Sequence, residues 1–140
     1  TFPHRLPADT ARATAAFAGD PRMDELTLQA ALAGAEAMAL GRTPGRTDLL
    51  AVSLSTTDAV GHRYGPGSRE IHDHLLRLDR YLGAFLDSLA RLVPRQATIV
   101  ALSADHGVQP FPEVTFRDRA GAALRIDVEP VLTRAQNALR

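Results

Sequence analysis

The sequence predicts an α/β fold in which a parallel sheet carries helices on both faces, with a small hairpin and a helix near the C-terminus. Two runs, residues 49–54 and 97–102, are apolar at consecutive positions instead of alternate ones, which is typical of strands covered on both faces. A long amphipathic segment separates them. A strand–helix–strand order of this length forms a right-handed parallel unit.

Before the first run, residues 9–17 predict a short helical turn. Asp20 and Pro21 then predict the start of a helix, because a carboxylate caps the free N–H groups and Pro suits the first helical position. Gly41 predicts its end, so we expect this helix to reach about Leu40.

After the first run, Ser68 predicts the cap of a helix over about 69–91, which Pro94 follows. Its apolar residues recur at spacings of three and four, the period of one helix face: Ile71, Leu75, Leu78, Leu82, Phe85 and Leu89. Beyond the second run, residues 114–116 and 123–128 predict a hairpin, and residues 129–139 a final helix.

Length and composition indicate one domain over residues 1–140. With 45% hydrophobic and 23% charged residues, the chain resembles ordinary globular proteins. A net charge of zero gives no reason to expect nucleic acid as a partner, and no apolar run approaches the ~20 residues of a membrane span. The chain starts at Thr1 without a signal peptide, and we expect it to be either a processed protein or a piece of a longer one.

Both apolar runs end in a carboxylate and an imidazole. Asp58 and His62 follow the first run, and Asp105 and His106 follow the second. Because ligands bind beyond the carboxyl ends of parallel strands, we expect these four side chains to meet at one edge of the sheet. Since cysteine is absent, a metal there would be held by His and carboxylate, which suits zinc.

Glycines shape both expected loops. Gly61 and Gly65 favour a loop, not a helix, around Asp58 and His62, and Gly107 permits a sharp turn after His106. The alternative is that all four are incidental polar loop residues, but two matched pairs at equivalent strand ends make it less favoured.

Other motifs are weaker. The stretch 65–68, GPGS, could hold a phosphate at a helix N-terminus, but it lacks the Lys-Ser/Thr of a P-loop. His72 and His74 would point apart on a helix, so we interpret them as surface or core-boundary residues. The hydroxyl residues near the expected site are better explained as hydrogen-bonding support than as nucleophiles: Ser55, Thr56, Thr57 and Ser103.

Two stretches together resemble the alkaline phosphatase superfamily: LLAVSLSTTDAVGHRYGPGSREIHDHLLRLDRYLGAFLDSL and, further on, ATIVALSADHGV. The most similar branch comprises the type I phosphodiesterase/nucleotide pyrophosphatase domain and related bacterial alkaline phosphatases. The resemblance is strongest over residues 47–113, and it implies a partial alkaline-phosphatase-like α/β domain.

By this resemblance, Asp58 and His62 match two ligands of one zinc ion, and Asp105 and His106 match two ligands of a second. The family's other metal ligands and its Thr or Ser nucleophile have no counterpart in this sequence. Because a catalytic zinc usually has three protein ligands and a water, we expect the chain alone to bind zinc weakly and to be inactive.

The resemblance implies a zinc-dependent phosphoric ester hydrolase that acts on small phosphate monoesters and is periplasmic or secreted, with the remainder of the same enzyme chain as its partner. Phosphate diesters or nucleotide pyrophosphates are the alternative substrates. Two rival interpretations remain: a non-catalytic α/β domain with relic metal ligands, and another branch such as the sulfatases or cofactor-independent phosphoglycerate mutases.

Overall fold

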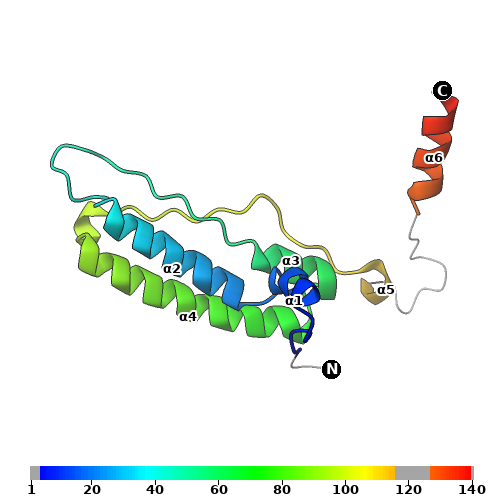
Figure 1. The fold of residues 1–140 in the computed structure, drawn as a ribbon, viewed down its shortest axis with the longest axis horizontal. Helices are drawn as coiled ribbons and strands as arrows, with labels where there is room; N and C mark the ends of the chain where they lie inside the picture. The colour runs from blue at the N-terminus through cyan, green and yellow to red at the C-terminus, as the bar shows by residue number, and fades with distance from the viewer. Residues whose placement is uncertain (1–3, 116–126, 140) are drawn as a thin grey trace. The chain divides into compact units, whose positions relative to one another are not determined.

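The chain is helical in the computed structural model, which describes residues 4–115 and 127–139 (Figure 1). Its α-helices are α1 (Thr10–Phe17), α2 (Arg22–Ala37), α3 (Thr56–Tyr64), α4 (Arg69–Leu92), α5 (Pro112–Thr115) and α6 (Glu129–Ala138), and a 3₁₀ turn, η1, covers Arg95–Ala97. Contacts divide the chain into two compact units, residues 1–108 and 109–140, which are described separately. The expectation of one partial domain stays a prediction.

Helices α2 and α4 form the long layer of the first unit, and α3 packs against the N-terminal part of α4 (Figure 1). Both long helices were predicted. The Ser68 cap is confirmed, since its Oγ accepts a hydrogen bond from the Ile71 N–H at 3.2 Å. At the start of α2, Pro21 and not Asp20 occupies the N-cap position, although Asp20 accepts the Arg22 N–H at 3.0 Å.

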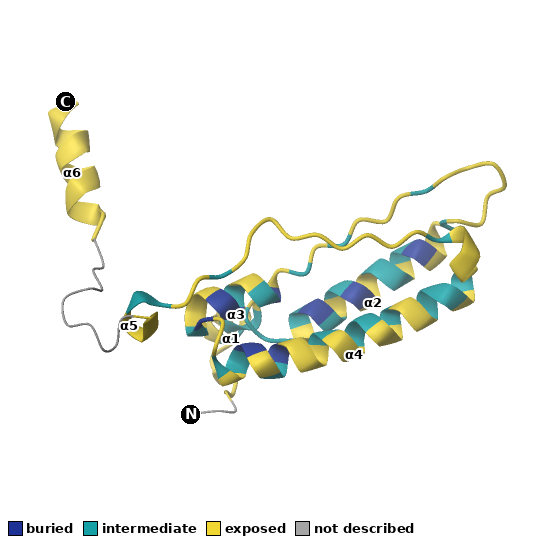
Figure 2. Ribbon diagram, turned by 180° about the vertical axis from the view of Figure 1, so that it is seen from behind, coloured by how far each residue is buried: buried dark blue, intermediate teal, exposed yellow. Residues whose placement is uncertain are grey.

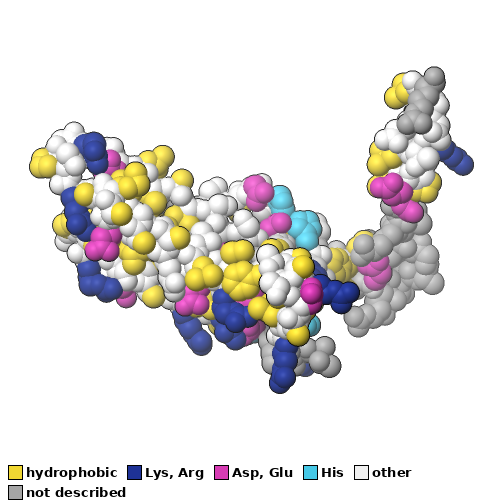
Figure 3. Space-filling model, viewed as in Figure 1, with side chains coloured by type: hydrophobic (Ala, Val, Ile, Leu, Met, Phe, Trp, Pro, Cys, Tyr) yellow, Lys and Arg dark blue, Asp and Glu magenta, His cyan; other side chains and the backbone are white. Residues whose placement is uncertain are grey.

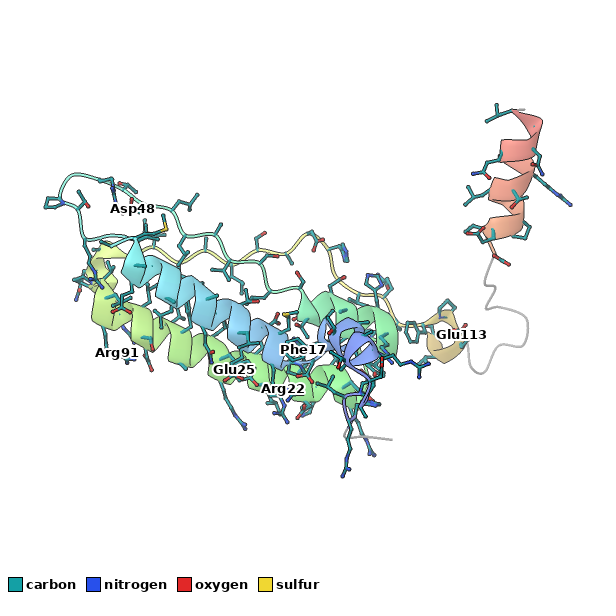
Figure 4. The ribbon with its side chains drawn as sticks, viewed as in Figure 1. Phe17, Arg22, Glu25, Asp48, Arg91 and Glu113 are labelled. Atoms are coloured by element: carbon teal, nitrogen blue, oxygen red, sulfur yellow. The ribbon has the colours of Figure 1, made fainter. Side chains whose placement is uncertain are left out.

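The α1–α2 corner is held by side chains of both helices. Asp9 caps α1 by accepting the Arg12 N–H at 2.9 Å. Arg22 pairs with Asp20 at 2.6 Å, and its guanidinium lies 5.9 Å from the centre of the Phe17 ring. Phe17 and Arg22 mark this corner in Figure 4. Hydrogen bonding by Arg22 holds the pKa of Asp20 below its usual value.

A small apolar core joins the helices of the first unit. It consists of five buried hydrophobic side chains on α2, α3, α4 and the turn after α4: Leu28, Ala35, Val60, Ile71 and Val93. The dark segments of Figure 2 mark these and the other buried positions. At the far end, Gly41 has φ +69° and lies so close to Val93 that a Cβ would come within 2.9 Å of its Cγ2. Only glycine suits this turn without strain.

The predicted parallel sheet is wrong for this chain, because the described residues contain no strand. Residues 49–55 and 98–102 run between helical segments without a β-bridge, and Ala97 ends the turn η1. Leu49 is 90% exposed, Ile99 97% and Leu102 88%. An apolar run forms a strand only beside a hydrogen-bonded neighbour, and neither run has one within the described ranges.

The second unit also corrects the sequence prediction. Residues 112–115 form the single turn α5, so the first arm of the expected hairpin begins as helix. Residues 116–126, which include the rest of that arm and most of the second, lie outside the described residues. The final helix is confirmed as α6, which has Pro130 in its first turn.

Candidate metal site

Helix α3 carries the first two predicted ligands. The structure corrects the expected loop: Asp58 and His62 lie four residues apart on one helical face, with His62 Nε2 3.1 Å from Asp58 Oδ1. Gly61 is inside this helix because of a close approach, since a Cβ there would lie 2.9 Å from Val108 Cγ2. Gly65, with φ +85°, ends the helix.

His106 joins this pair from a segment 44 residues further along the chain. Its Nε2 lies 3.8 Å from Asp58 Oδ1, and its ring centre is 6.0 Å from that of His62, edge to face. One ligand atom from each of Asp58, His62 and His106 lies within 4.8 Å of the others. Figure 3 shows histidine and acidic side chains gathered on this face, beside α3. We call these three residues the Asp58–His62–His106 cluster.

Asp105, the fourth predicted ligand, lies at the margin of the cluster. Its side chain is 87% exposed, and Oδ2 is 3.5 Å from His106 Nε2. Its other oxygen accepts the backbone N–H of His106 at 3.0 Å. The structure therefore brings three of the four predicted residues together and leaves Asp105 facing solvent. The division of the four between two ions stays a prediction.

The backbone selects the nitrogen that His106 presents. His106 Nδ1 lies 3.0 Å from the Gly107 carbonyl oxygen. Because a carbonyl can only accept, Nδ1 carries the hydrogen, and in the neutral ring Nε2 keeps a lone pair directed to the cluster. The bond to Gly107, with smaller contributions from Asp105 and Asp58, raises the pKa of His106. A metal ion that binds Nε2 would have to displace the proton that this nitrogen carries in the charged ring.

A buried polar group lies beneath the first turn of α3. Asp24, Thr56 and His74 are each 1% exposed or less. Asp24 Oδ1 accepts from the Thr56 Oγ1 hydroxyl at 2.9 Å and from the Thr56 N–H at 3.3 Å. Thr57 Oγ1 and His74 Nε2 are 2.8 Å apart, and that nitrogen lies 3.7 Å from Asp24 Oδ2.

Thr56 and Thr57 form hydrogen bonds in this group, and their support of a metal site stays a prediction. The surface or core-boundary position predicted for His74 is wrong, because its side chain is buried. The sequence analysis missed Asp24, because an acidic residue in the first turn of a helix is explained by the helix dipole alone. Burial lowers the pKa of His74 against the opposing effect of Asp24, so its ring is neutral at pH 7.

A cavity among the described residues lies away from the cluster. It has a volume of about 550 Å³ and lies between the N-terminal segment, the α1–α2 corner, α3 and α4, with Arg5, Asp20, Arg22, Arg63, Tyr64, Glu70, Asp73 and Arg77 among its lining residues. Several charges in it are paired: Arg22 with Asp20, Arg77 with Asp73, and His4 with Glu70. It offers no compact set of metal ligands.

No helix within the described ranges has both the length and the apolar character needed to cross a membrane.

Comparison with known proteins connects this chain to one family. The sequence model of the family described as type I phosphodiesterase / nucleotide pyrophosphatase matches residues 3–124. The alkaline phosphatase PhoV of Synechococcus elongatus is 37% identical over 129 residues, which are 92% of this chain and 23% of that protein. The alkaline phosphatase PafA of Elizabethkingia meningoseptica is 45% identical over 87 residues, 62% of this chain and 16% of that protein.

A human relative extends the similarity to phosphodiesterases. Ectonucleotide pyrophosphatase/phosphodiesterase family member 7 is 31% identical over 84 residues, 51% of this chain and 18% of that protein. No solved structure gave a significant match. The chain thus spans less than a quarter of the length of each of these three relatives.

Proposed function

Because this chain belongs to the type I phosphodiesterase/nucleotide pyrophosphatase family of the alkaline phosphatase superfamily, we propose that it forms part of a zinc-dependent phosphoric ester hydrolase. The observation that carries the proposal is the meeting of Asp58, His62 and His106 within 4.8 Å, from two segments distant in sequence. Packing of the core does not explain why these side chains meet, since all three are half-exposed or more.

The residues present fit zinc. Two imidazole nitrogens and one carboxylate oxygen are a known zinc ligand set, and a catalytic site keeps a further position open. The exposure of all three side chains leaves such a position accessible to a substrate. A zinc ion held there would supply Lewis-acid polarisation of a phosphoryl oxygen.

The chain's own residues prepare this site. The carboxylate of Asp58 lies within hydrogen-bond distance of the His62 imidazole, and the Gly107 carbonyl directs the lone pair of His106 Nε2 inward. Asp105, whose Oδ2 lies 3.5 Å from His106 Nε2, would serve as a ligand of a second ion. We expect the chain alone to bind zinc weakly, because the family's other metal ligands have no counterpart in this sequence. We expect it not to hydrolyse substrate, because the nucleophile implied by the family resemblance has no counterpart either.

Small phosphate monoesters are the first substrate class, supported by the names of the relatives at 37–45% identity. Phosphate diesters or nucleotide pyrophosphates are the second, supported by the family description and the human relative. Export to the periplasm or secretion is likewise proposed from the family resemblance.

The test is a zinc titration of the chain by calorimetry. We expect Asp58→Ala, His62→Ala and His106→Ala each to weaken zinc binding by at least about tenfold, since even the loss of an outer partner of a metal ligand has that effect. His72→Ala is the matched control, because His72 is an exposed histidine of α4 outside the cluster. If the wild type binds no zinc, or if all four variants bind it equally, the interpretation as a domain with relic ligands replaces this one.

Hydrolysis is tested in the longer enzyme that we propose contains this chain. His106→Ala should abolish turnover of p-nitrophenyl phosphate there, whereas His72→Ala should leave it unchanged. Faster turnover of bis(p-nitrophenyl) phosphate than of the monoester would favour the diesterase alternative. Turnover by the 140-residue chain alone would contradict the expected inactivity.

A further inference from the structure

The buried group formed by Asp24, Thr56, Thr57 and His74 lies directly beneath the helix that carries two proposed ligands. Asp58 is the next residue after Thr57, and His62 lies one turn further along α3. Asp24 comes from α2 and His74 from α4. The group therefore ties the start of α3 to both long helices of the first unit.

Helix α3 needs this support. It has nine residues and contains Gly61, and a helix so short is unstable by itself in water. Ser55 occupies the N-cap position without making a side-chain capping bond. Asp24 takes over that function from another helix, since its carboxylate accepts the Thr56 N–H, one of the free donors at the helix start.

Asp24 also lies in the first turn of its own helix, α2. Its carboxylate is therefore placed at the N-terminal, positive ends of two helix dipoles at once. An uncharged side chain of similar shape would keep the packing and lose this interaction.

His74 completes the support through its Nε2 atom. That nitrogen lies 2.8 Å from Thr57 Oγ1 and 3.7 Å from Asp24 Oδ2. A lone pair there would face a carboxylate, so the favoured neutral form carries its hydrogen on Nε2 and donates it to the Thr57 hydroxyl. Nδ1, which has no hydrogen-bond partner among the described residues, is then left as an unpaired acceptor.

We propose that Asp24 and His74 are positioning residues of the metal site: they hold the first turn of α3 so that Asp58 and His62 face His106. This inference rests on the proposed function. It assigns to α2 and α4 a role in metal affinity, although neither helix provides a ligand. Removing an outer partner that orients a ligand typically weakens metal binding 10–100-fold.

The test uses Co²⁺ as the probe, because its visible absorption reports the number and geometry of its ligands. Asp24→Ala should weaken Co²⁺ binding by about 10–100-fold and lower the absorption of the bound ion. Leu28→Ala is the control for general destabilisation, since Leu28 is a buried apolar residue one turn further along α2. It should lower thermal stability and leave Co²⁺ affinity within about twofold of wild type.

A second pair of variants keeps the test decisive if Asp24→Ala does not fold. His74→Gln can place an amide N–H near the position of Nε2 and should retain wild-type Co²⁺ affinity, whereas His74→Leu and Thr57→Val should lose it. Equal affinity in His74→Gln and His74→Leu, or in folded Asp24→Ala and Leu28→Ala, would overturn the inference.

The same titration distinguishes a failure of the positioning role from a failure of the metal site. If Asp58→Ala weakens Co²⁺ binding but Asp24→Ala and His74→Leu do not, the proposed function stands and the positioning role is wrong. If Asp58→Ala has no effect, the metal site itself is wrong, and the positioning role is overturned with it.

Discussion

The close approach of α3 to the segment that carries His106 gives a prediction about both stability and metal binding. The contact depends on Gly61, where the Cβ of an alanine would lie 2.9 Å from Val108 Cγ2. Carbon atoms prefer a separation of about 3.5–4.0 Å, so Gly61→Ala must move the two segments apart by roughly 0.6–1 Å or rotate the valine. Val108 is two residues from His106, and this shift would carry the imidazole away from Asp58.

Two effects of opposite sign decide the stability of Gly61→Ala. Replacing Gly by Ala inside a helix stabilises it by about 0.8–1 kcal/mol. Overpacking typically costs about 1–3 kcal/mol. We therefore expect a net loss of up to about 2 kcal/mol in the free energy of unfolding, together with weaker zinc binding.

Urea unfolding and zinc calorimetry of four proteins measure both effects: wild type, Gly61→Ala, Val108→Ala and the double variant. Val108→Ala removes the atoms that the new Cβ would meet, so the double variant should be more stable than Val108→Ala alone by the helix-propensity gain. If Gly61→Ala itself is more stable by about 1 kcal/mol and binds zinc as the wild type does, the close contact does not exist in solution.

Three further predictions concern charge and exposed surface. Zinc affinity should fall between pH 8 and pH 6, because the raised pKa of His106 keeps its imidazole protonated over more of that range; a constant dissociation constant from calorimetry would contradict this. Burial lowers the pKa of His74 in the folded chain, so near and below the ordinary histidine pKa of 6.5 the unfolded chain binds more protons than the folded chain. The free energy of unfolding should therefore fall as the pH falls through and below that value. Urea unfolding at pH 7.5 and 5.5 should show a smaller fall in His74→Gln than in the wild type. Ile99→Lys should reduce self-association, measured by analytical ultracentrifugation, because a charge there interrupts the exposed apolar run 97–102. Gln96→Lys is the matched control, because Gln96 is exposed and lies outside that run.

Sequence reasoning succeeded where the signal was local. The α4 helix was predicted from Ser68 and an apolar stripe, and the Ser68 hydroxyl does cap it. It failed for α3, because Gly61 was interpreted as a helix breaker, whereas its lack of a side chain admits Val108 from a distant segment. It failed for the two apolar runs because hydrophobicity indicates what a residue could bury, not whether a neighbouring strand is present.

The candidate site shows the same division. The residue types at Asp58, His62, Asp105 and His106 suggested a metal site from their chemistry alone, but not which of them meet. Asp24 carried no signal of its own, since its partners, Thr56 and His74, lie 32 and 50 residues away.

The sequence by itself determined the two long helices, because caps, turns and helical periodicity are properties of neighbouring residues, and its two motifs identified the superfamily. Only the tertiary structure decided that α3 is a helix, that His106 joins Asp58 and His62 while Asp105 faces solvent, and that a buried carboxylate of α2 caps the helix that carries two of these residues. Those outcomes depend on distances between segments far apart in the chain, and such distances are set by packing and not by local propensity.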